Sequence, residues 1–239
     1  MKTRILTLAL LALVLFTSSC EKGVFCTKGE GAIVEQALEL PPITGIDMCL
    51  AGDVALTQGE AQSIVVHGQQ NIIDKLKFDV KNGVWTIDVD GCVNYKDNLR
   101  FEITLPTLTD AHVTGSGDIW TTNHFTELTN VATSISGSGD MDLSFDANTV
   151  DTDITGSGNY DLTGTCATHD FKLSGSGNLD AYEFTTSTSA IKISGSGDAE
   201  ISATDQLDAR ISGSGTISYK GNPTIDVDIS GSGDLINAN

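Results

Sequence analysis

The sequence predicts an all-β protein: a parallel β-helix, or β-solenoid, of short coils that follows an N-terminal part containing a β-hairpin. Three observations support this prediction. Gly-Ser-Gly recurs seven times from residue 113 onward, apolar and polar residues alternate around each copy, and short polar turns separate the alternating pieces. The first glycine of each copy stands at positions 115, 137, 156, 175, 195, 213 and 231. A period of roughly 20 residues is typical of solenoids, because each repeat can bury its apolar face only against neighbouring repeats.

Residues 1–19 have the order of a bacterial lipoprotein signal peptide. A basic start precedes an apolar run, Ile5 to Phe16, which is too short to span a bilayer, and small residues then lead to Cys20. The order resembles signals in which the cysteine is acylated, so we expect an outer-membrane lipoprotein anchored through Cys20. Thr17 stands where the commonest pattern has Leu, so plain secretion with cleavage near Ser19 is the alternative.

Residues 20–42 are predicted to be a tether, since three glycines and the pair Pro41-Pro42 interrupt them. Residues 43–112 are predicted to form the N-terminal coils and a hairpin. The hairpin is expected at Asn82-Gly83, which lies between two alternating runs and is the strongest short hairpin signal. A strand is expected over 99–106, where every second residue is apolar.

Residues 113–235 are predicted to form the repeat coils, so that the whole domain spans 43–235. In the unit at 135–145, Ile135, Met141 and Leu143 share one face with the glycines, while serines and aspartates share the other. Each coil would add about 4.8 Å, the distance between strands, and eight or so coils would give a rod of roughly 40 Å.

The repeated glycines are interpreted as a building rule: they lie where the coil bends or where the interior is too narrow for a side chain. The polar residue after each phrase would stack from coil to coil as a surface ladder. The residues of this candidate ladder are Asp118, Asp140, Asn159, Asn178, Asp198 and Asp234. Calcium binding is the alternative, but a straight ladder converges poorly on an ion that wants six to eight oxygens.

Four cysteines follow Cys20, and an exported protein can form disulfides. We expect one bridge in the N-terminal half that includes Cys92, with Cys49 or Cys26 as its partner. Cys49–Cys92 is taken as the expected pair, and Cys166 is expected to be free. No Cys-x-x-Cys or Cys/His cluster is present, so we expect no metal site.

Several segments together resemble one bacterial family. They are GDVALTQGEAQSIVVHG, the hairpin KNGVWTI, the strand RFEITLPTL and the serial SGSGD units, after a lipoprotein signal. The chain is similar, over about residues 43–235, to the head GIN domain family of Bacteroidota lipoproteins, which are described as auto-transporter adhesins. The resemblance implies a right-handed β-helical fold and an adhesin function, and it brings no catalytic residues. Thr216 departs from the pattern, because it replaces the Asp of the phrase.

The formal charge of -19 argues against binding to nucleic acid and against electrostatic docking to anionic lipid headgroups. The carboxylate pairs Asp140/Asp142 and Asp151/Asp153 are not marked by a cleft, as a glycosidase site would be. The four histidines, at 67, 112, 124 and 169, have no ligand spacing and are interpreted as surface or turn residues. Trp85 and Trp120 are interpreted as core or edge residues, with stacking on sugar rings as the alternative.

The function predicted from these observations is non-enzymatic recognition at the cell envelope, without a cofactor. The protein would bind a glycan, or an envelope or host protein, through repeated polar faces, at the cell surface or on the periplasmic side. The alternatives are a periplasmic scaffolding lipoprotein and, with less support, a carbohydrate-active β-helix enzyme. The oligomeric state stays open, although exposed strand edges near 225–235 favour end-to-end association.

Overall fold

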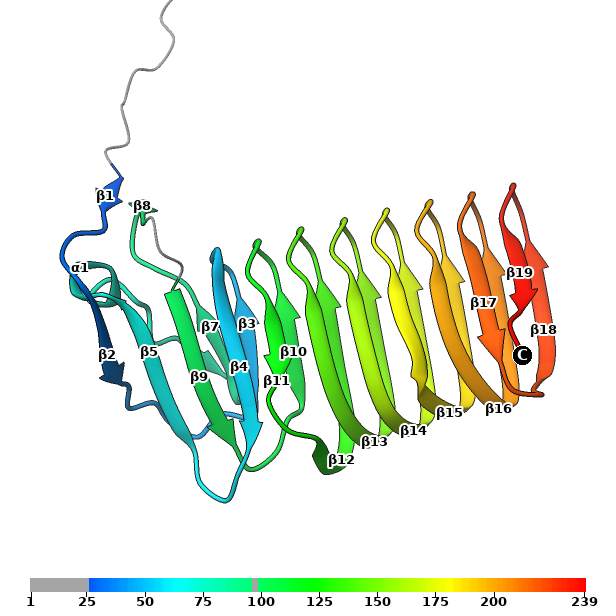
Figure 1. The fold of residues 1–239 in the computed structure, drawn as a ribbon, viewed down its shortest axis with the longest axis horizontal. Helices are drawn as coiled ribbons and strands as arrows, with labels where there is room; N and C mark the ends of the chain where they lie inside the picture. The colour runs from blue at the N-terminus through cyan, green and yellow to red at the C-terminus, as the bar shows by residue number, and fades with distance from the viewer. Residues whose placement is uncertain (1–25, 96–98) are drawn as a thin grey trace, which may run out of the picture.

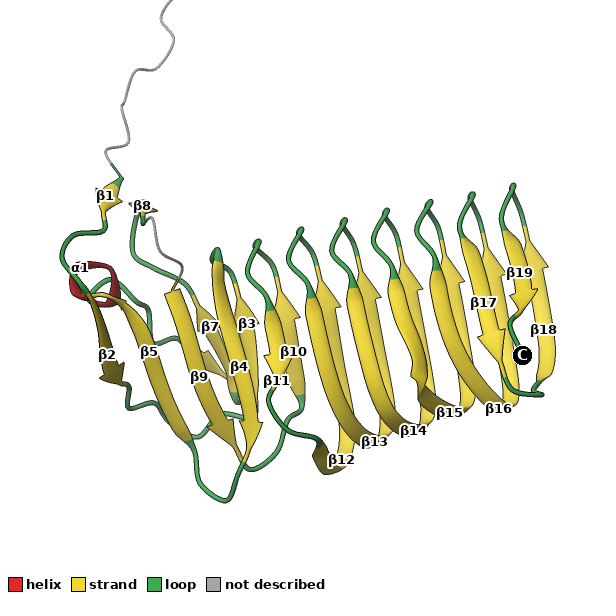
Figure 2. Ribbon diagram, viewed as in Figure 1, coloured by secondary structure: helices red, strands yellow, loops and turns green. Residues whose placement is uncertain are grey.

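The computed structural model describes residues 26–95 and 99–239, which form a β-solenoid (Figure 1). The predicted signal peptide 1–19 and the acylation site Cys20 lie outside the described residues. The solenoid is one 17-stranded sheet that folds into two layers, called sheets below, and these layers run along the solenoid and face each other. The Gly-Ser-Gly loops connect the two sheets along one edge, the upper edge of Figure 1, and along the other edge most strands bend across without a loop (Figure 2). The predicted fold class is confirmed.

The coils are built from strands that pair in parallel with their counterparts in the next coil. Met141, Tyr160, Leu179, Ala199 and Ile217 occupy equivalent positions in five successive coils. The strands are β3 (Gly45–Met48), β4 (Gly52–Gln58), β10 (Asp110–Val113), β11 (Ile119–Thr121), β12 (Phe125–Ile135), β13 (Met141–Ile154), β14 (Tyr160–Leu173), β15 (Leu179–Ile193), β16 (Ala199–Ile211), β17 (Thr216–Lys220), β18 (Thr224–Ile229) and β19 (Asp234–Asn237). We call the layer whose strand segments end at the loops of the upper edge the preceding sheet; it contains β3, β10, β18 and the C-terminal halves of β12–β16. We call the layer whose segments begin after these loops the following sheet; it contains β4, β11, β17, β19 and the N-terminal halves of β13–β16.

The N-terminal part extends both sheets and then covers their ends. The predicted hairpin is present as β6 (Val80–Lys81) and β7 (Val84–Ile87), with positive φ angles of 53° at Asn82 and 82° at Gly83. The strand expected over 99–106 is β9 (Leu99–Leu105), whose alternate side chains are buried. β7 pairs with β3 and β9 pairs with β4, so both belong to the solenoid sheets.

The segment expected to be a tether is part of the domain in its second half. β2 (Ile33–Ala37) pairs antiparallel with β5 (Ser63–Gln69), which in turn pairs antiparallel with β9. The short helix α1 (Gln70–Ile73) buries two isoleucines beside them. β1 (Thr27–Lys28) pairs in parallel with β8 (Val93–Asn94). β2 ends at Ala37, before Pro41-Pro42, and its residues form an edge strand because β5 offers them backbone partners.

The core fills the space between the sheets with alternate side chains of every coil. Phe145 and Phe184 stack edge to face with 5.5 Å between ring centroids, although one coil separates their strands. They can meet because Gly164 occupies the position between them in register and has no side chain. Trp85 is fully buried and its indole N–H donates to the carbonyl oxygen of Lys77 at 3.0 Å, so the core interpretation of this residue is confirmed.

The repeated glycines form two columns in which each residue lies directly over its equivalent in the previous coil. A Cβ placed on Gly158 would overlap the carbonyl oxygen of Gly139, and one on Gly177 would overlap that of Gly158. The loops are also joined by backbone hydrogen bonds between coils, such as Ser176 N to Gly156 O at 2.9 Å. The glycines are therefore needed for close backbone approach between coils, and the interpretation as a building rule holds.

The disulfide differs from the expected pair. Cys26 is bonded to Cys92, whereas Cys49 and Cys166 are free. The pairing of β1 with β8 brings Cys26 to a Cα–Cα distance of 4.5 Å from Cys92. Cys49 instead directly follows β3, and its backbone N–H donates to the carbonyl oxygen of Ile87. It therefore belongs to the solenoid and lies outside the β1–β8 pair that carries the disulfide. Cys166 is free, as expected, and buried.

Within the described ranges, no helix is long and apolar enough to cross a membrane.

Candidate functional site

The predicted ladder residues stack along the following sheet, at the mouth of the loops. The carboxylate of Asp118 accepts the backbone N–H of Asp140 at 2.9 Å. The carboxylate of Asp140 accepts the backbone N–H of Asn159 at 2.6 Å and its side-chain N–H at 3.2 Å. Each acidic or amide oxygen thus satisfies a donor in the next coil, which offsets part of the repulsion between stacked carboxylates.

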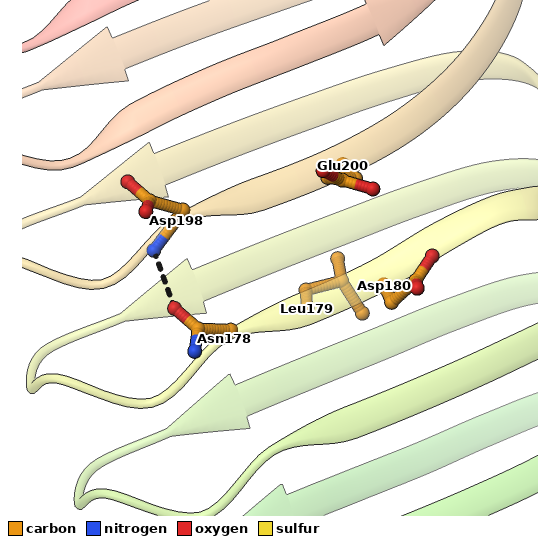
Figure 3. A pocket seen from close by; sticks show the side chains of 5 residues that line it. All are labelled: Asn178, Leu179, Asp180, Asp198 and Glu200. Atoms are coloured by element: carbon orange, nitrogen blue, oxygen red, sulfur yellow. Dashed lines mark hydrogen bonds between the residues drawn. The ribbon is translucent and has the colours of Figure 1, made fainter.

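The same pattern continues toward the C-terminus. The Asn178 amide donates to Asn159 Oδ1 at 3.1 Å, and Asn178 Oδ1 accepts the backbone N–H of Asp198 at 3.0 Å (Figure 3). Asp198 in turn accepts the backbone N–H of Thr216 at 2.7 Å. Asp234 occupies the next position by its register with Thr216. The two asparagines therefore interrupt the line of charge without interrupting the hydrogen-bonded ladder.

A second acidic row lies two residues further along the same strands and was not predicted as a site. Asp142, Asp161, Asp180 and Glu200 follow one another in register on successive coils. The sequence carried the signal, because an acidic residue stands two positions after the Asp or Asn of four successive phrases. We define the acidic face as this second row together with the six ladder residues.

One carboxylate of the acidic face has a raised pKa. Partial burial, together with the charges of Asp180, Asp142 and Asp140, raises the pKa of Asp161. The neighbouring carboxylates therefore add to the effect of burial in favouring the protonated form of Asp161.

Two shallow hollows lie on the acidic face. One, of about 290 Å³, is lined by Asn178, Leu179, Asp180, Asp198 and Glu200 (Figure 3). Another, of about 270 Å³, is bordered by Trp120 and by carboxylates of both rows, among them Asp140 and Asp142. Each hollow is open to solvent and has room for a few side-chain groups only. The face therefore suits an extended partner better than a small molecule, which would need a pocket that encloses it.

Trp120 is partly exposed, unlike Trp85. It is in register with Asp142 and therefore lies one coil before the first residue of the second row. The Arg100 guanidinium lies 5.6 Å from the centre of its ring, a cation–π contact. Trp120 lies neither in the core nor on an edge strand, because β11 pairs with β4 and with β13. Its ring contacts a cation and borders the hollow that carboxylates line.

Metal binding finds no support in residues 26–95 and 99–239, where no group of three or more His, Cys, Asp or Glu side chains is arranged to hold an ion. Asp140 directly precedes β13 and Asp142 lies on it, so both carboxylates border the open hollow beside Trp120 from the same strand segment.

The preceding sheet has a different electrostatic character, because four of its carboxylates lie beside a lysine or an arginine. Lys172 lies 3.4 Å from Asp170 and 3.9 Å from Asp151, on neighbouring coils. Arg210 lies 3.1 Å from Asp208 and 2.9 Å from Asp226. The second sequence-predicted carboxylate pair, Asp151 and Asp153, lies on this sheet. Negative charge is thus compensated in part on one side of the solenoid and accumulates on the other.

Three histidines are exposed or partly exposed, as expected, and His169 is not. His67 and His124 lie near Glu102 and Asp146, and His112 contacts Ser134. His169 is buried in the core, where its Nε2 lies 3.2 Å from Thr152 Oγ1. The surface interpretation was wrong for this residue, which is in phase with the inward-facing Phe171 and Leu173. Burial lowers its pKa to about 4, so it is neutral at pH 7.

Comparison with known proteins gives the family. The chain matches the family described as "Putative auto-transporter adhesin, head GIN domain" over residues 43–223. A comparison with curated proteins found no match.

Three solved structures share the fold. A "putative adhesin" from Bacteroides fragilis has a TM-score of 0.81 and 25% identity, and the match covers 88% of this chain and 99% of that one. A "putative lipid binding protein" from Parabacteroides distasonis has a TM-score of 0.73 and 22% identity, and the match covers 88% of this chain and 99% of that one. A "putative adhesin" from the same species has a TM-score of 0.69 and 24% identity, and the match covers 87% of this chain and 98% of that one.

The descriptions of the family and of its first structural relative support an adhesin-like, non-enzymatic role in an extracellular or envelope-associated protein. The family match covers most of the chain, and it includes the repeat coils and most of the glycine columns. The chain belongs to the head GIN domain family.

Proposed function

We propose that this protein is a lipid-anchored recognition module of the cell envelope, and that it binds an extended, positively charged segment of another protein along its acidic face. Binding would not involve catalysis. The observation that carries the proposal is the asymmetry of charge. Two rows of carboxylates and amides line the following sheet, while four carboxylates on the preceding sheet lie beside Lys172 or Arg210.

The chemistry of the face favours a basic protein segment over an anionic glycan. The rows repeat once per coil, so charges recur about every 4.8 Å along the solenoid. A partner that presents Lys or Arg side chains would find complementary potential, which speeds association and orients the complex. An anionic polysaccharide would meet repulsion, and a neutral glycan would gain nothing from the charge.

Reversing charge on the acidic face is expected to abolish binding of a basic probe. The variant Asp180→Lys/Glu200→Lys replaces one acidic side chain by lysine on each of the two strands that border the hollow in Figure 3. We expect the affinity for a fluorescent hexalysine peptide, measured by anisotropy at low salt, to fall by at least about tenfold. The control Glu39→Lys/Glu60→Lys makes the same change in net charge at exposed positions of the N-terminal part and should bind nearly as the unmodified protein does.

Two outcomes would contradict this function. Equal losses in both variants would mean that only net charge matters. Binding of a neutral glucan oligosaccharide in place of the peptide, insensitive to salt, would point to the glycan as ligand. Salt sensitivity is part of the expected result, because exposed charges are screened within about 8 Å at physiological ionic strength.

The location on the envelope can be tested with intact cells. We expect Cys20→Ser to remove the lipid label and to release the protein from the membrane fraction, because a thioether-linked lipid needs the cysteine sulfur. Protease added to intact cells should cleave the unmodified protein while a periplasmic control survives. If both survive and lysed cells show that the protein is cleavable, the scaffolding role on the periplasmic side replaces recognition outside the cell.

A further inference from the structure

The C-terminal end of the solenoid exposes side chains that are buried in the coil before it. On β18, the exposed fractions are 38% for Ile225, 46% for Val227 and 40% for Ile229. The residues in register with them on β16 are 0–1% exposed: Leu207, Ala209 and Ile211. The exposure therefore arises because no coil is stacked on the last one, and not because these side chains point outward.

The backbone at this end is also unpaired. Among the described strands, β18 pairs only with β16, and β19 pairs only with β17. Half of the backbone N–H and C=O groups of such edge strands lack a strand partner, which is an invitation to pairing with another chain. The other end of the solenoid differs: antiparallel β5 and β2 and the helix α1 cover it (Figure 1). Solenoids ordinarily need a polar cap at each end.

We infer that two copies of this chain join end to end through β18, which pairs antiparallel with β18 of the second copy. The segment is a palindrome, Ile225-Asp226-Val227-Asp228-Ile229. A two-fold axis through Val227 places this residue opposite its own copy and places Ile225 opposite Ile229 of the second copy. Every exposed apolar side chain of the strand then meets an apolar side chain.

This arrangement keeps the interior of the solenoid continuous. A rotation about an axis perpendicular to a sheet does not exchange the two faces of that sheet. The core of one copy therefore continues into the core of the other, and β19 comes toward β19 in the opposite sheet. The interface is isologous and closes at two copies, because the two-fold axis brings the C-terminal edge of each copy against the same edge of the other.

The charged residues of the palindrome tolerate this register. It sets Asp226 against Asp228 of the second copy on the outer surface, where water and salt screen them. The Arg210 guanidinium lies 2.9 Å from Asp226 Oδ2 and supplies a cation to each of the two pairs. The dimer does not depend on the proposed ligand, but it would present two acidic faces at once, which raises avidity for a repeated partner.

A charge placed at the centre of the interface tests the inference. The full chain in mild detergent should have the protein mass of a dimer by light scattering. Val227→Lys should be monomeric at the same concentration, since a lysine would face a lysine within an apolar patch. Ile33→Lys is the matched control: Ile33 is 45% exposed on β2, at the opposite end, and its variant should stay dimeric. A monomeric unmodified chain, or the same mass for both variants, would overturn the inference.

A crosslink tests the register itself and does not depend on how the lysine variant folds. Directly opposed residues of antiparallel strands have Cα atoms about 4.5–5.5 Å apart, within reach of a disulfide. Val227→Cys, in a Cys49→Ser background, should give a covalent dimer on a non-reducing gel. Ile225→Cys in the same background should not, because its partner would be Ile229. Crosslinking of neither variant, or of both equally, would contradict the two-fold axis at Val227.

Discussion

Replacing Gly177 with valine is expected to cost about 4 kcal/mol or more of stability, the largest effect of any single substitution proposed for this protein. A Cβ at this position would overlap the Gly158 carbonyl oxygen and come within 3.2 Å of the Ile154 side chain. The first obstacle is backbone, which cannot rotate away. Relief would require the two coils to separate, and their hydrogen bonds would be lost with the separation.

Ser176→Val is the matched control, since it adds the same side chain between the two glycines of the same loop. Ser176 is exposed, so its variant should change the free energy of unfolding by less than about 0.5 kcal/mol. Urea denaturation followed by circular dichroism measures both. A Gly177→Val protein that unfolds at the same urea concentration as Ser176→Val would show that close stacking of the glycine columns is not required for stability.

Acid is expected to destabilise the protein through His169 before most carboxylates are protonated. Burial among aromatic side chains, with Phe184 at 5.8 Å between ring centroids, lowers the pKa of His169 to about 4, and the nearby Asp170 opposes this only in part. The unfolded chain has an ordinary histidine pKa of about 6.5. Between these values the unfolded state binds more protons, so the free energy of unfolding falls as pH falls. The full loss is on the order of 3 kcal/mol.

His169→Leu should remove this dependence. Leucine fits the chemistry of the position, because Val150 precedes it in the same column and Leu207 follows two coils later. In this variant Thr152 loses its contact with the imidazole of His169, but its hydroxyl keeps the contact with the Thr133 hydroxyl at 3.0 Å. Denaturation midpoints measured between pH 7 and pH 4.5 should slope less in this variant than in the unmodified protein. His67→Leu, at a partly exposed position, should keep the slope. An NMR titration of His169 near pH 6.5 would disprove the explanation.

Local chemistry explains why several elements could be predicted from the sequence. Asn82-Gly83 specifies its hairpin because both residues accept positive φ at little cost. Leu99 to Leu105 alternates in burial as it alternates in sequence. The surface ladder followed from the position of one Asp or Asn per repeat. The second acidic row and the burial of His169 could have been found by extending the same alternation by two residues.

The sequence by itself determined that the chain stacks on itself, because a short period with paired glycines leaves no other way to bury each coil's apolar face. Only the tertiary structure decided what happens at the two ends. Whether residues 33–37 were a tether or a strand depended on an edge offered by β5, and whether Cys92 met Cys26 or Cys49 depended on β1 lying beside β8. These contacts join segments far apart in the chain, and their register is set by the packing of the whole end rather than by any local preference.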